Sequence, residues 1–272
     1  MGIEKERMKG CGIIQYGLQW QTNGYEERRI SYANEPVLYY RFRSDSGGGA
    51  VHVVPDGCTD LMFCCEPSKA QAEICGTVLE GKSISLVPNA DYFGVRLSVK
   101  SSMMLPGLPL KEAIGLQVPF EEALRPYSRV GEKLAEADTF EDKIARFERD
   151  CLPLIVPDGG ASGLVDYCLS AMHRSCGSVA IKALAEKCGY SERYVRTKFE
   201  QTVGMPPKLY NRIVRFQQAL EGVVRGTRPL TEVANDRGYF DQAHFMKDFM
   251  TFSRLSPSQI RSLCSLRGRT LL

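Results

Sequence analysis

The sequence predicts a two-domain α+β protein, with an N-terminal antiparallel β-barrel or β-sandwich, a helical extension and an all-α C-terminal domain. Short β-branched and aromatic runs fill the first 110 residues, whereas helical periodicity dominates the remainder. One helical pattern also occurs twice within residues 178–261. At 272 residues and 43% hydrophobic content, the chain can bury two separate cores. We expect a β-domain over residues 1–110, a helical extension and linker over 111–157, and the all-α domain over 158–272.

Six runs are predicted to be strands of the β-domain, because turn residues such as those at 44–49 and 55–57 separate them. They cover residues 11–20, 36–43, 50–54, 60–65, 83–87 and 93–99. Apolar and polar side chains alternate along residues 37–43, so Tyr39, Arg41 and Arg43 are expected to share one face.

The helical extension carries one apolar stripe, formed by Phe140, Ile144, Phe147 and Cys151. Two uses of this stripe remain open from the residues alone, namely self-association and packing against the chain's own β-domain. Prolines at 153 and 157 and the glycines that follow predict a linker. A helix over residues 164–173 then begins the all-α domain.

The repeated pattern has the layout of a helix-turn-helix motif. Each copy, at residues 181–199 and 230–249, carries an alanine in its first helix and a glycine four residues later. The alanine permits close helix crossing, and the glycine permits positive φ in the turn. Ser191 and Asp241 then occupy the N-cap position of the second helix. The pattern predicts two DNA-reading helices that start 50 residues apart.

A linker helix is predicted between the two copies, opened by Pro206 and Pro207. Its apolar stripe is Leu209, Ile213, Phe216, Leu220 and Val223. Lys208, Arg212 and Arg215 form a basic row on another face, which suits phosphate contact. Such a helix would hold the two reading helices about 34 Å apart, one turn of DNA.

The charge distribution favours a polyanionic partner for the C-terminal part only. The formal net charge of the chain is +3, but residues 176–272 hold 16 Lys and Arg against 8 Asp and Glu. Residues 1–175 hold 19 against 24. A solvated basic surface would explain the charge alone, but the duplicated pattern favours double-stranded DNA.

The side chains expected to read DNA are those left exposed when the apolar positions of each second helix face inward. Arginines suit guanine, Gln242 suits adenine, and Thr197 and Ala243 suit thymine methyl groups. The candidates are Ser191, Glu192, Arg193, Arg196 and Thr197 in the first copy, Gln242, Ala243, His244, Met246 and Lys247 in the second, and the basic row of the linker helix.

Residues 178–261 resemble the DNA-binding domain of AraC-type transcriptional regulators. The residues that carry the resemblance are Ala185, Gly189, Tyr190, Ser191, Phe199, Gly204, Met205, Pro206, Pro207, Lys208, Tyr210, Arg212, Arg215, Ala219, Gly238, Tyr239, Phe245, Phe249, Ser256, Pro257, Ser258 and Gln259. The segment 55–63, preceded by His52, and the segment 93–96 resemble the cupin-like N-terminal domain of one subgroup. The resemblance implies a sequence-specific regulator, controlled by a small molecule, whose helical extension can form a homodimer.

If the β-domain closes into a barrel, its mouth is the expected small-molecule site. The polar and aromatic candidates to line it are Tyr39, Arg41, His52, Asp60, Tyr92 and Arg96. An arginine fork at Arg96 or Arg41 would favour an anionic or carbonyl-bearing metabolite. The alternative is structural: Asp56 and Asp60 cap a tight turn, and Arg96 pairs with one of them.

Other classes of protein are not supported by the sequence. The ten cysteines show no metal-binding spacing, a cupin-type histidine set is missing, and no catalytic residues, metal or cofactor are expected. The chain shows no 18-residue apolar run and no secretory signal, which predicts a cytoplasmic protein with reduced thiols and no membrane contact. Two alternatives remain: a DNA binder whose β-domain only dimerises, and an alkyl-transfer DNA-repair protein.

Overall fold

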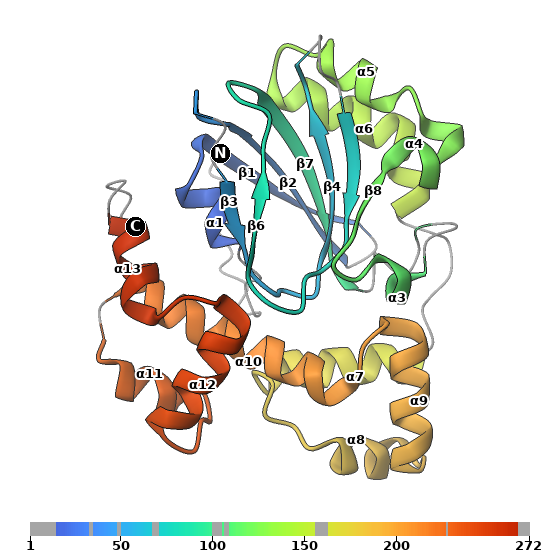
Figure 1. Ribbon diagram of the computed structural model, residues 1–272. Helices are drawn as coiled ribbons and strands as arrows, with labels where there is room; N and C mark the ends of the chain where they lie inside the picture. The colour runs from blue at the N-terminus through green and yellow to red at the C-terminus, as the bar shows by residue number, and fades with distance from the viewer. Residues whose placement is uncertain are drawn as a thin grey trace, which may run out of the picture.

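The computed structural model describes residues 15–32, 35–47, 50–66, 71–99, 105, 109–155, 163–226 and 228–265. A β-rich part and a helical part are stacked on each other (Figure 1). This confirms the predicted α+β class with an antiparallel N-terminal region and an all-α C-terminal region.

The N-terminal region is built on a six-stranded antiparallel sheet and a separate two-stranded sheet. The large sheet has the order β1 (Asn23–Tyr32), β2 (Glu35–Arg43), β7 (Asp91–Leu97), β4 (Thr59–Cys64), β5 (Gln71–Cys75) and β8 (Gln117–Pro119). The small sheet pairs β3 (Ala50–Val53) with β6 (Lys82–Ser85). Among the described strands β1 and β8 each have a single partner, so the large sheet is an open one rather than a closed barrel.

Three strands were missed by the sequence patterns. β1 carries the charged run Glu26 to Arg29 on an edge, where a strand needs no apolar stripe and charges prevent pairing with other chains. β5 and β8 are five and three residues long. Because β8 pairs with β5, the sheet continues beyond residue 110 into the segment expected to be a helical extension.

One face of the large sheet is covered by α4 (Phe120–Ala123), α5 (Val130–Ala135) and α6 (Phe140–Ile155) (Figure 1). Phe147 of α6 is fully buried, and its ring lies 6.0 Å from both Tyr39 and Phe63 of the sheet. Phe140, Ile144 and Cys151 belong to the same core. Of the two uses left open by the sequence, the structure shows packing of this apolar stripe against its own sheet. Helix α6 also runs through Pro153, where a linker was expected; positions 157–160 lie outside the described residues.

The other face of the large sheet is covered by β3, β6 and the short helix α1 (Tyr16–Trp20). A strand was expected over residues 11–20, of which 11–14 lie outside the described residues. Residues 16–20 instead form a helix, whose buried side chains Tyr16, Leu18 and Trp20 belong to two different cores. Leu18 packs in the β-domain, whereas Tyr16 and Trp20 stack on each other at 4.6 Å and pack against the helical region.

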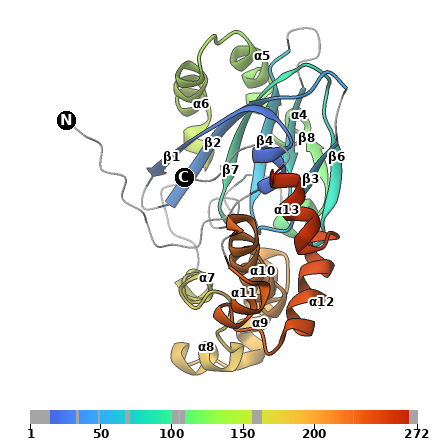
Figure 2. The same cartoon turned by 90° about the vertical axis from the view of Figure 1, so that its left-hand side faces the viewer.

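The helical region contains α7 (Gly163–Arg174), α8 (Ile181–Cys188), α9 (Glu192–Val203), α10 (Pro207–Arg225), α11 (Leu230–Asp236), α12 (Gln242–Ser253) and α13 (Pro257–Ser265). The short helix α3 (Leu110–Ala113) contacts α9 from the β-domain side. The long helix α10 joins the pair α8–α9 to the pair α11–α12 (Figures 1 and 2). Tyr16, Trp20, Val54 and Val99 of the β-domain lie in the same hydrophobic core as these helices, so the two regions are packed together.

Candidate nucleic-acid interface and effector cavity

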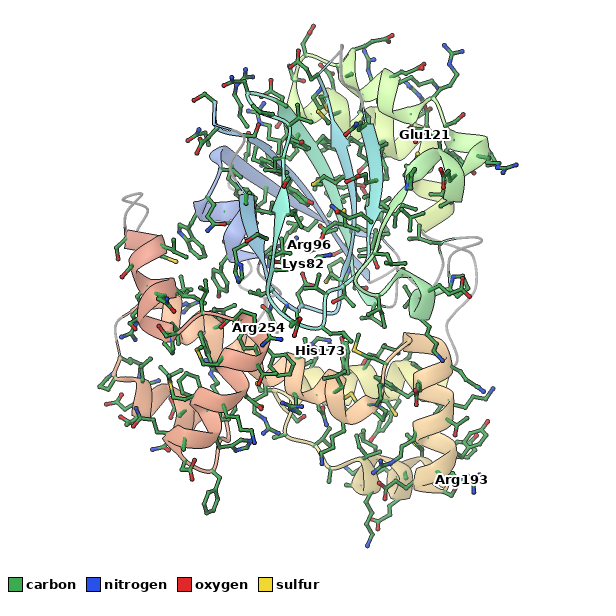
Figure 3. The ribbon with its side chains drawn as sticks, viewed as in Figure 1. Lys82, Arg96, Glu121, His173, Arg193 and Arg254 are labelled. Carbon is green, nitrogen blue, oxygen red and sulfur yellow. The ribbon has the colours of Figure 1, made fainter. Side chains whose placement is uncertain are left out.

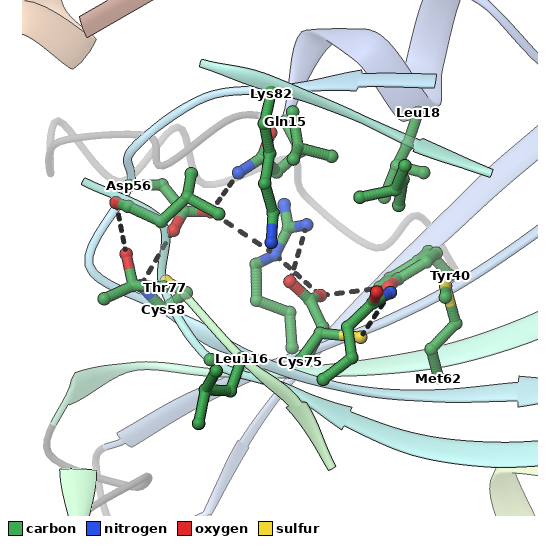
Figure 4. A pocket seen from close by; sticks show the side chains of 17 residues that line it. Gln15, Leu18, Tyr40, Asp56, Cys58, Met62, Cys75, Thr77, Lys82 and Leu116 are labelled. Carbon is green, nitrogen blue, oxygen red and sulfur yellow. Dashed lines mark hydrogen bonds and ion pairs between the residues drawn. The ribbon is translucent and has the colours of Figure 1, made fainter. Parts of the chain in front are cut away.

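A small cavity of about 40 Å³ lies between the large sheet and the β3–β6 sheet (Figure 4). Its polar lining comes from Gln15, Tyr40, Asp56, Asp60, Thr77, Lys82, Arg96 and Gln117. Val53, Lys82 and Ile84 of the β3–β6 sheet form one wall, so this sheet covers the cavity as a lid. Such a volume has room for a few water molecules.

Arg96 and two carboxylates form a buried triad in this cavity. The Nε and Nη2 atoms of Arg96 donate to the two carboxylate oxygens of Asp60 at 3.0 and 3.1 Å. The Oδ2 atom of Asp56 lies 3.9 Å from Arg96 Nε. The Arg96 side chain is 4% exposed. The alternative in which Arg96 pairs with an aspartate is therefore observed, because Asp60 occupies the guanidinium fork. The prediction that Arg96 selects an anionic metabolite loses its basis.

Asp56 is the carboxylate whose ionisation is most perturbed. Burial raises its pKa to about 6, with Arg96 opposing that shift and Asp60 adding to it. Asp56 accepts hydrogen bonds from Gln15 Nε2 at 2.8 Å and from the backbone nitrogen of Cys58 at 2.9 Å. The second bond closes the tight turn that was expected at this aspartate. Burial also raises the pKa of Cys75, another lining residue, to about 12, so this thiol is protonated at neutral pH.

Of the six residues predicted to line a ligand site, only Asp60 and Arg96 lie at the cavity. Tyr39 faces the opposite side of β2, where it packs against Phe93 and Phe147. Tyr40 takes its place, and its hydroxyl donates to Asp60 at 2.9 Å. The ring of Tyr40 crosses strand β7 at Gly94, where an added Cβ would lie 2.1 Å from Tyr40 Cζ.

The remaining three predicted residues have other partners. Arg41 is exposed and forms an ion pair with Glu26 at 2.7 Å. Tyr92 stacks on Phe42 at 4.9 Å, and its hydroxyl accepts from the Val87 nitrogen. His52 lies at the boundary with the helical region. Sequence reasoning missed Gln15, Tyr40, Thr77 and Lys82. Strand alternation does not tell which buried face of β2 holds the cavity, and the other three residues are brought to it from distant segments.

The two turns of the repeated helical pattern have the predicted geometry. Gly189 and Gly238 adopt φ values of 71° and 70°, in the left-handed region that glycine tolerates best. Ala185 and Ala234 are 3% and 1% exposed, as expected for helices in close contact. The side chain of Ser191 accepts from the Tyr194 nitrogen at 3.2 Å, and that of Asp241 accepts from the His244 nitrogen at 2.6 Å. Both N-cap predictions are confirmed.

The second helix of each pair presents a polar face to solvent. In α9, Val195 and Phe199 are buried, whereas Ser191, Arg193, Arg196 and Thr197 are exposed and Glu192 is half-buried. Arg193 points away from the β-domain (Figure 3). Arg196 forms an ion pair with Glu192 of the same face. In α12, Phe245 and Phe249 are buried and Gln242, Ala243, His244 and Lys247 are exposed. Met246 is half-buried against the core, which makes it the weakest of the reading candidates.

Residues 184–262 match the family model described as a helix-turn-helix domain. The helix pairs α8–α9 and α11–α12 give this part of the chain a helix-turn-helix layout, and it is called the helix-turn-helix domain below. An uncharacterized HTH-type transcriptional regulator from Haemophilus influenzae is 35% identical over 86 residues. That match covers 32% of this chain, and the chain spans only 29% of the relative's length.

Solved structures are similar at low sequence identity. The C-terminal domain of AraT, a response regulator from Geobacillus stearothermophilus, is 24% identical over 41% of this chain and 89% of that chain, with a TM-score of 0.36. ToxT from Vibrio cholerae, in a structure with unsaturated fatty acid bound, is 9% identical over 92% of this chain and 94% of that chain, with a TM-score of 0.42.

The exposed basic row that was expected on α10 is not formed, because two of its three residues have partners inside the protein. In the helix-turn-helix domain, Arg212 Nη2 donates to the buried Asp248 at 2.8 Å, and its guanidinium lies 5.0 Å from the Phe252 ring. Arg215 donates to the Gly177 carbonyl at 2.9 Å and lies over the Tyr239 ring. These two arginines hold the helices of the domain together, and only Lys208 of the row is exposed.

The helix-turn-helix domain contacts the β-domain at two places that border the cavity. At α10, Gln217 Nε2 donates to the Pro55 carbonyl at 2.6 Å, and Gly57 packs against the Tyr210 ring. Pro55 and Gly57 flank Asp56, which lines the cavity. At the end of α12, His52 Nε2 donates to the Ser253 carbonyl at 2.6 Å.

The lid carries the second of these contacts. His52 belongs to β3, and Gly81, which precedes β6, lies so close that an added Cβ would be 2.4 Å from the Ser253 oxygen. Glu80, one residue earlier, forms an ion pair with Arg254. The turn at 55–57 is therefore attached to α10, and the β3–β6 lid is attached to the end of α12. Both helices belong to the part of the chain that carries the reading surfaces.

Within the described part of the chain, no group of three or more His, Cys, Asp or Glu residues could hold a metal ion. None of the described helices combines the length and apolar character that a membrane span needs.

Proposed function

We propose that the protein is a sequence-specific DNA-binding transcriptional regulator of the AraC type, controlled by a small molecule in its N-terminal domain. The observation that carries the proposal is the pair of capped helix-turn-helix units joined by the single helix α10. Each unit exposes a polar face on its second helix. A helix with such a face fits the major groove of double-stranded DNA, with its N-terminal residues against the base edges.

The exposed residues suit different bases in the two units. Arg193 and Arg196 can donate two hydrogen bonds to guanine, and Arg196 would exchange its contact with Glu192 for the base. Gln242 suits adenine, and Lys247 suits guanine or a phosphate. Lys208 and the backbone nitrogens at the starts of α9 and α12 suit phosphates, so binding should weaken steeply with salt.

Binding-site selection from random duplexes, followed by substitution of Arg193, tests the DNA-reading role. Arg193→Ala is expected to cost about 1–3 kcal/mol on the selected duplex and to relax the preference for one base, because a guanine contact is lost. Affinity for unselected DNA should change far less. Gel-shift titrations at fixed salt measure both.

Arg129→Ala is the matched control, since Arg129 is an exposed arginine of the β-domain with an 83% exposed side chain. A variant of Arg193 that loses the same affinity on selected and random duplexes would assign this residue to phosphate contact. Failure to select any sequence would contradict the proposed function itself.

The cavity under the β3–β6 lid is the proposed effector site, supported by its polar lining and its two links to the helix-turn-helix domain. A metabolite needs more than about 40 Å³, so an effector requires a wider cavity, which displacement of the lid would provide. Movement of the lid would change the contacts of His52 and Glu80 with the end of α12. An effector with different affinity for the two lid positions would thereby change DNA binding.

Native-state hydrogen exchange of the full chain tests whether the lid can open. The amides of β3 and β6 are expected to exchange through a smaller opening free energy than those of β2, β4 and β7, because the lid is only a two-stranded sheet. The central strands serve as the internal reference. Equal protection of the lid and the central strands would contradict the effector role of this cavity.

A further inference from the structure

The turn of the second helix-turn-helix unit contains one more residue than the turn of the first. Counting from the turn glycine, the buried phenylalanine of the second helix follows after ten residues at Phe199 and after eleven at Phe249. The additional residue lies between Tyr239 and the N-cap Asp241. It is Phe240, a residue that is 91% exposed. No other large hydrophobic side chain in the described part of the chain is as exposed.

The turn holds Phe240 in place from both sides. Tyr239 is 4% exposed, and its ring packs against Phe245 at 5.4 Å and under Arg215. Asp241 caps the His244 nitrogen at 2.6 Å, and the Phe240 nitrogen itself donates to His244 Nδ1 at 3.5 Å. With an anchored neighbour on each side, the backbone of Phe240 is held in place and directs the ring outward.

In the first unit, the aromatic residue of the turn packs against a neighbouring ring. Tyr190, which follows Gly189, stacks on Tyr194 with ring centroids 4.9 Å apart. Phe240 takes part in none of the ring contacts found among the described residues. A phenylalanine ring kept in water at the start of a reading helix leaves a large apolar area available for a partner.

The residues around Phe240 indicate which chemical group of the DNA its ring contacts. The start of α9 carries charged side chains: Arg193 and Arg196 are exposed, and Glu192 is half-buried. The start of α12 exposes the uncharged Phe240, Gln242 and Ala243 together with the charged N-cap Asp241, whose carboxylate accepts from the His244 nitrogen. Along the major groove, the C5-methyl of thymine is the apolar group that a base edge offers, and phenylalanine is among the side chains that contact it.

We propose that Phe240 contacts a thymine C5-methyl group, so that the operator is asymmetric, with a guanine-containing half read by α9 and a thymine-containing half read by α12. The inference rests on the proposed function, because it places the N-terminal end of α12 in the major groove. Gln242 pairs with adenine in the same half, and Ala243 adds a second apolar contact.

The experiment removes the methyl group from the DNA and the ring from the protein. A duplex selected by the wild-type chain is remade with each thymine of the α12 half replaced singly by deoxyuridine, which differs only by that methyl. Wild-type affinity is expected to fall about fourfold at one position, as burial of one methyl group implies. Phe240→Ala is expected to bind the thymine duplex more weakly and to bind the thymine and deoxyuridine duplexes equally well at that position.

Leu79→Ala is the control variant, since Leu79 is a 39% exposed leucine of the β-domain. It should keep both the wild-type affinity and the fourfold discrimination. Because Phe240 is almost fully exposed, its variant should melt at the wild-type temperature, which separates a binding defect from a folding defect.

Three results would overturn the inference. The first is a wild-type chain indifferent to deoxyuridine at every position of the α12 half. The second is a Phe240→Ala variant that keeps the discrimination. The third is a variant that binds every duplex as tightly as the wild type, which would show that the ring makes no contact with the DNA. In each case the selected sequence and the Arg193 effect would stand, so the proposed function would survive.

Discussion

Replacing Arg96 by alanine is expected to lower the free energy of unfolding by about 3–5 kcal/mol, the cost of leaving buried charges without their partner. Arg96 is 4% exposed and donates to both oxygens of Asp60, with Asp56 at 3.9 Å. Burial disfavours the charged guanidinium, but the two carboxylates outweigh it and raise the pKa of Arg96. Without the arginine, two carboxylates would face each other in a cavity with little water. Urea titration monitored by circular dichroism measures the loss.

Arg43→Ala is the matched control, because Arg43 lies on the neighbouring strand β2 and pairs with Asp91 at 2.7 Å in an exposed setting. Its loss should cost at most about 1 kcal/mol. The deficit of the Arg96 variant should also shrink at low pH, since protonated carboxyl groups need no cation. Equal losses in the two variants would show that the triad is no more stabilising than a surface pair.

Replacing Gly94 by alanine is expected to destabilise the β-domain by about 1–3 kcal/mol, the usual effect of excess volume in a packed core. The added Cβ would lie 2.1 Å from Tyr40 Cζ and 2.5 Å from its hydroxyl oxygen. Tyr40 is 1% exposed and stacked between Tyr25 and Phe42, so its ring cannot move aside without disturbing this core. The hydrogen bond from Tyr40 to Asp60 would be lost as well. Thermal unfolding of the purified chain measures the effect.

A double-mutant cycle with Tyr40→Leu assigns the cause of the Gly94 effect. If the clash with the ring is responsible, Gly94→Ala should cost much less in the Tyr40→Leu background. Gly47→Ala is the control, because nothing lies within 4 Å of the position of its added Cβ. Additive losses for Gly94 and Tyr40 would place the strain elsewhere.

The helix-turn-helix units could be predicted from sequence because their determinants are local. The N-cap Ser191, the turn glycine Gly189 and the buried pair Val195 and Phe199 lie within eleven residues of one another. Helix periodicity and positive φ act over this range, so the pattern alone places the exposed face of α9. Arg193 and Gln242 were identified in this way, and both are exposed.

The residues of the cavity could not be predicted, because contacts between distant segments select them. Alternation along β2 separates Tyr39 from Tyr40, but both faces of this strand are buried, one under α6 and the other under the β3–β6 lid. The role of Arg212 likewise depends on Asp248, 36 residues away on α12. Its helical position indicated a solvent-facing basic row, whereas packing of α12 against α10 pairs the half-buried Arg212 with the buried Asp248.

The sequence by itself determined the class of fold, the two helix-turn-helix units and the side chains they expose, since short-range backbone preferences and apolar periodicity act within single elements. Only the tertiary structure decided that α6 covers its own sheet, that Arg96 is neutralised by Asp60, and that the PDG turn at 55–57 contacts α10. These outcomes depend on which buried surfaces meet, and burial free energy is non-directional until the elements are packed against one another.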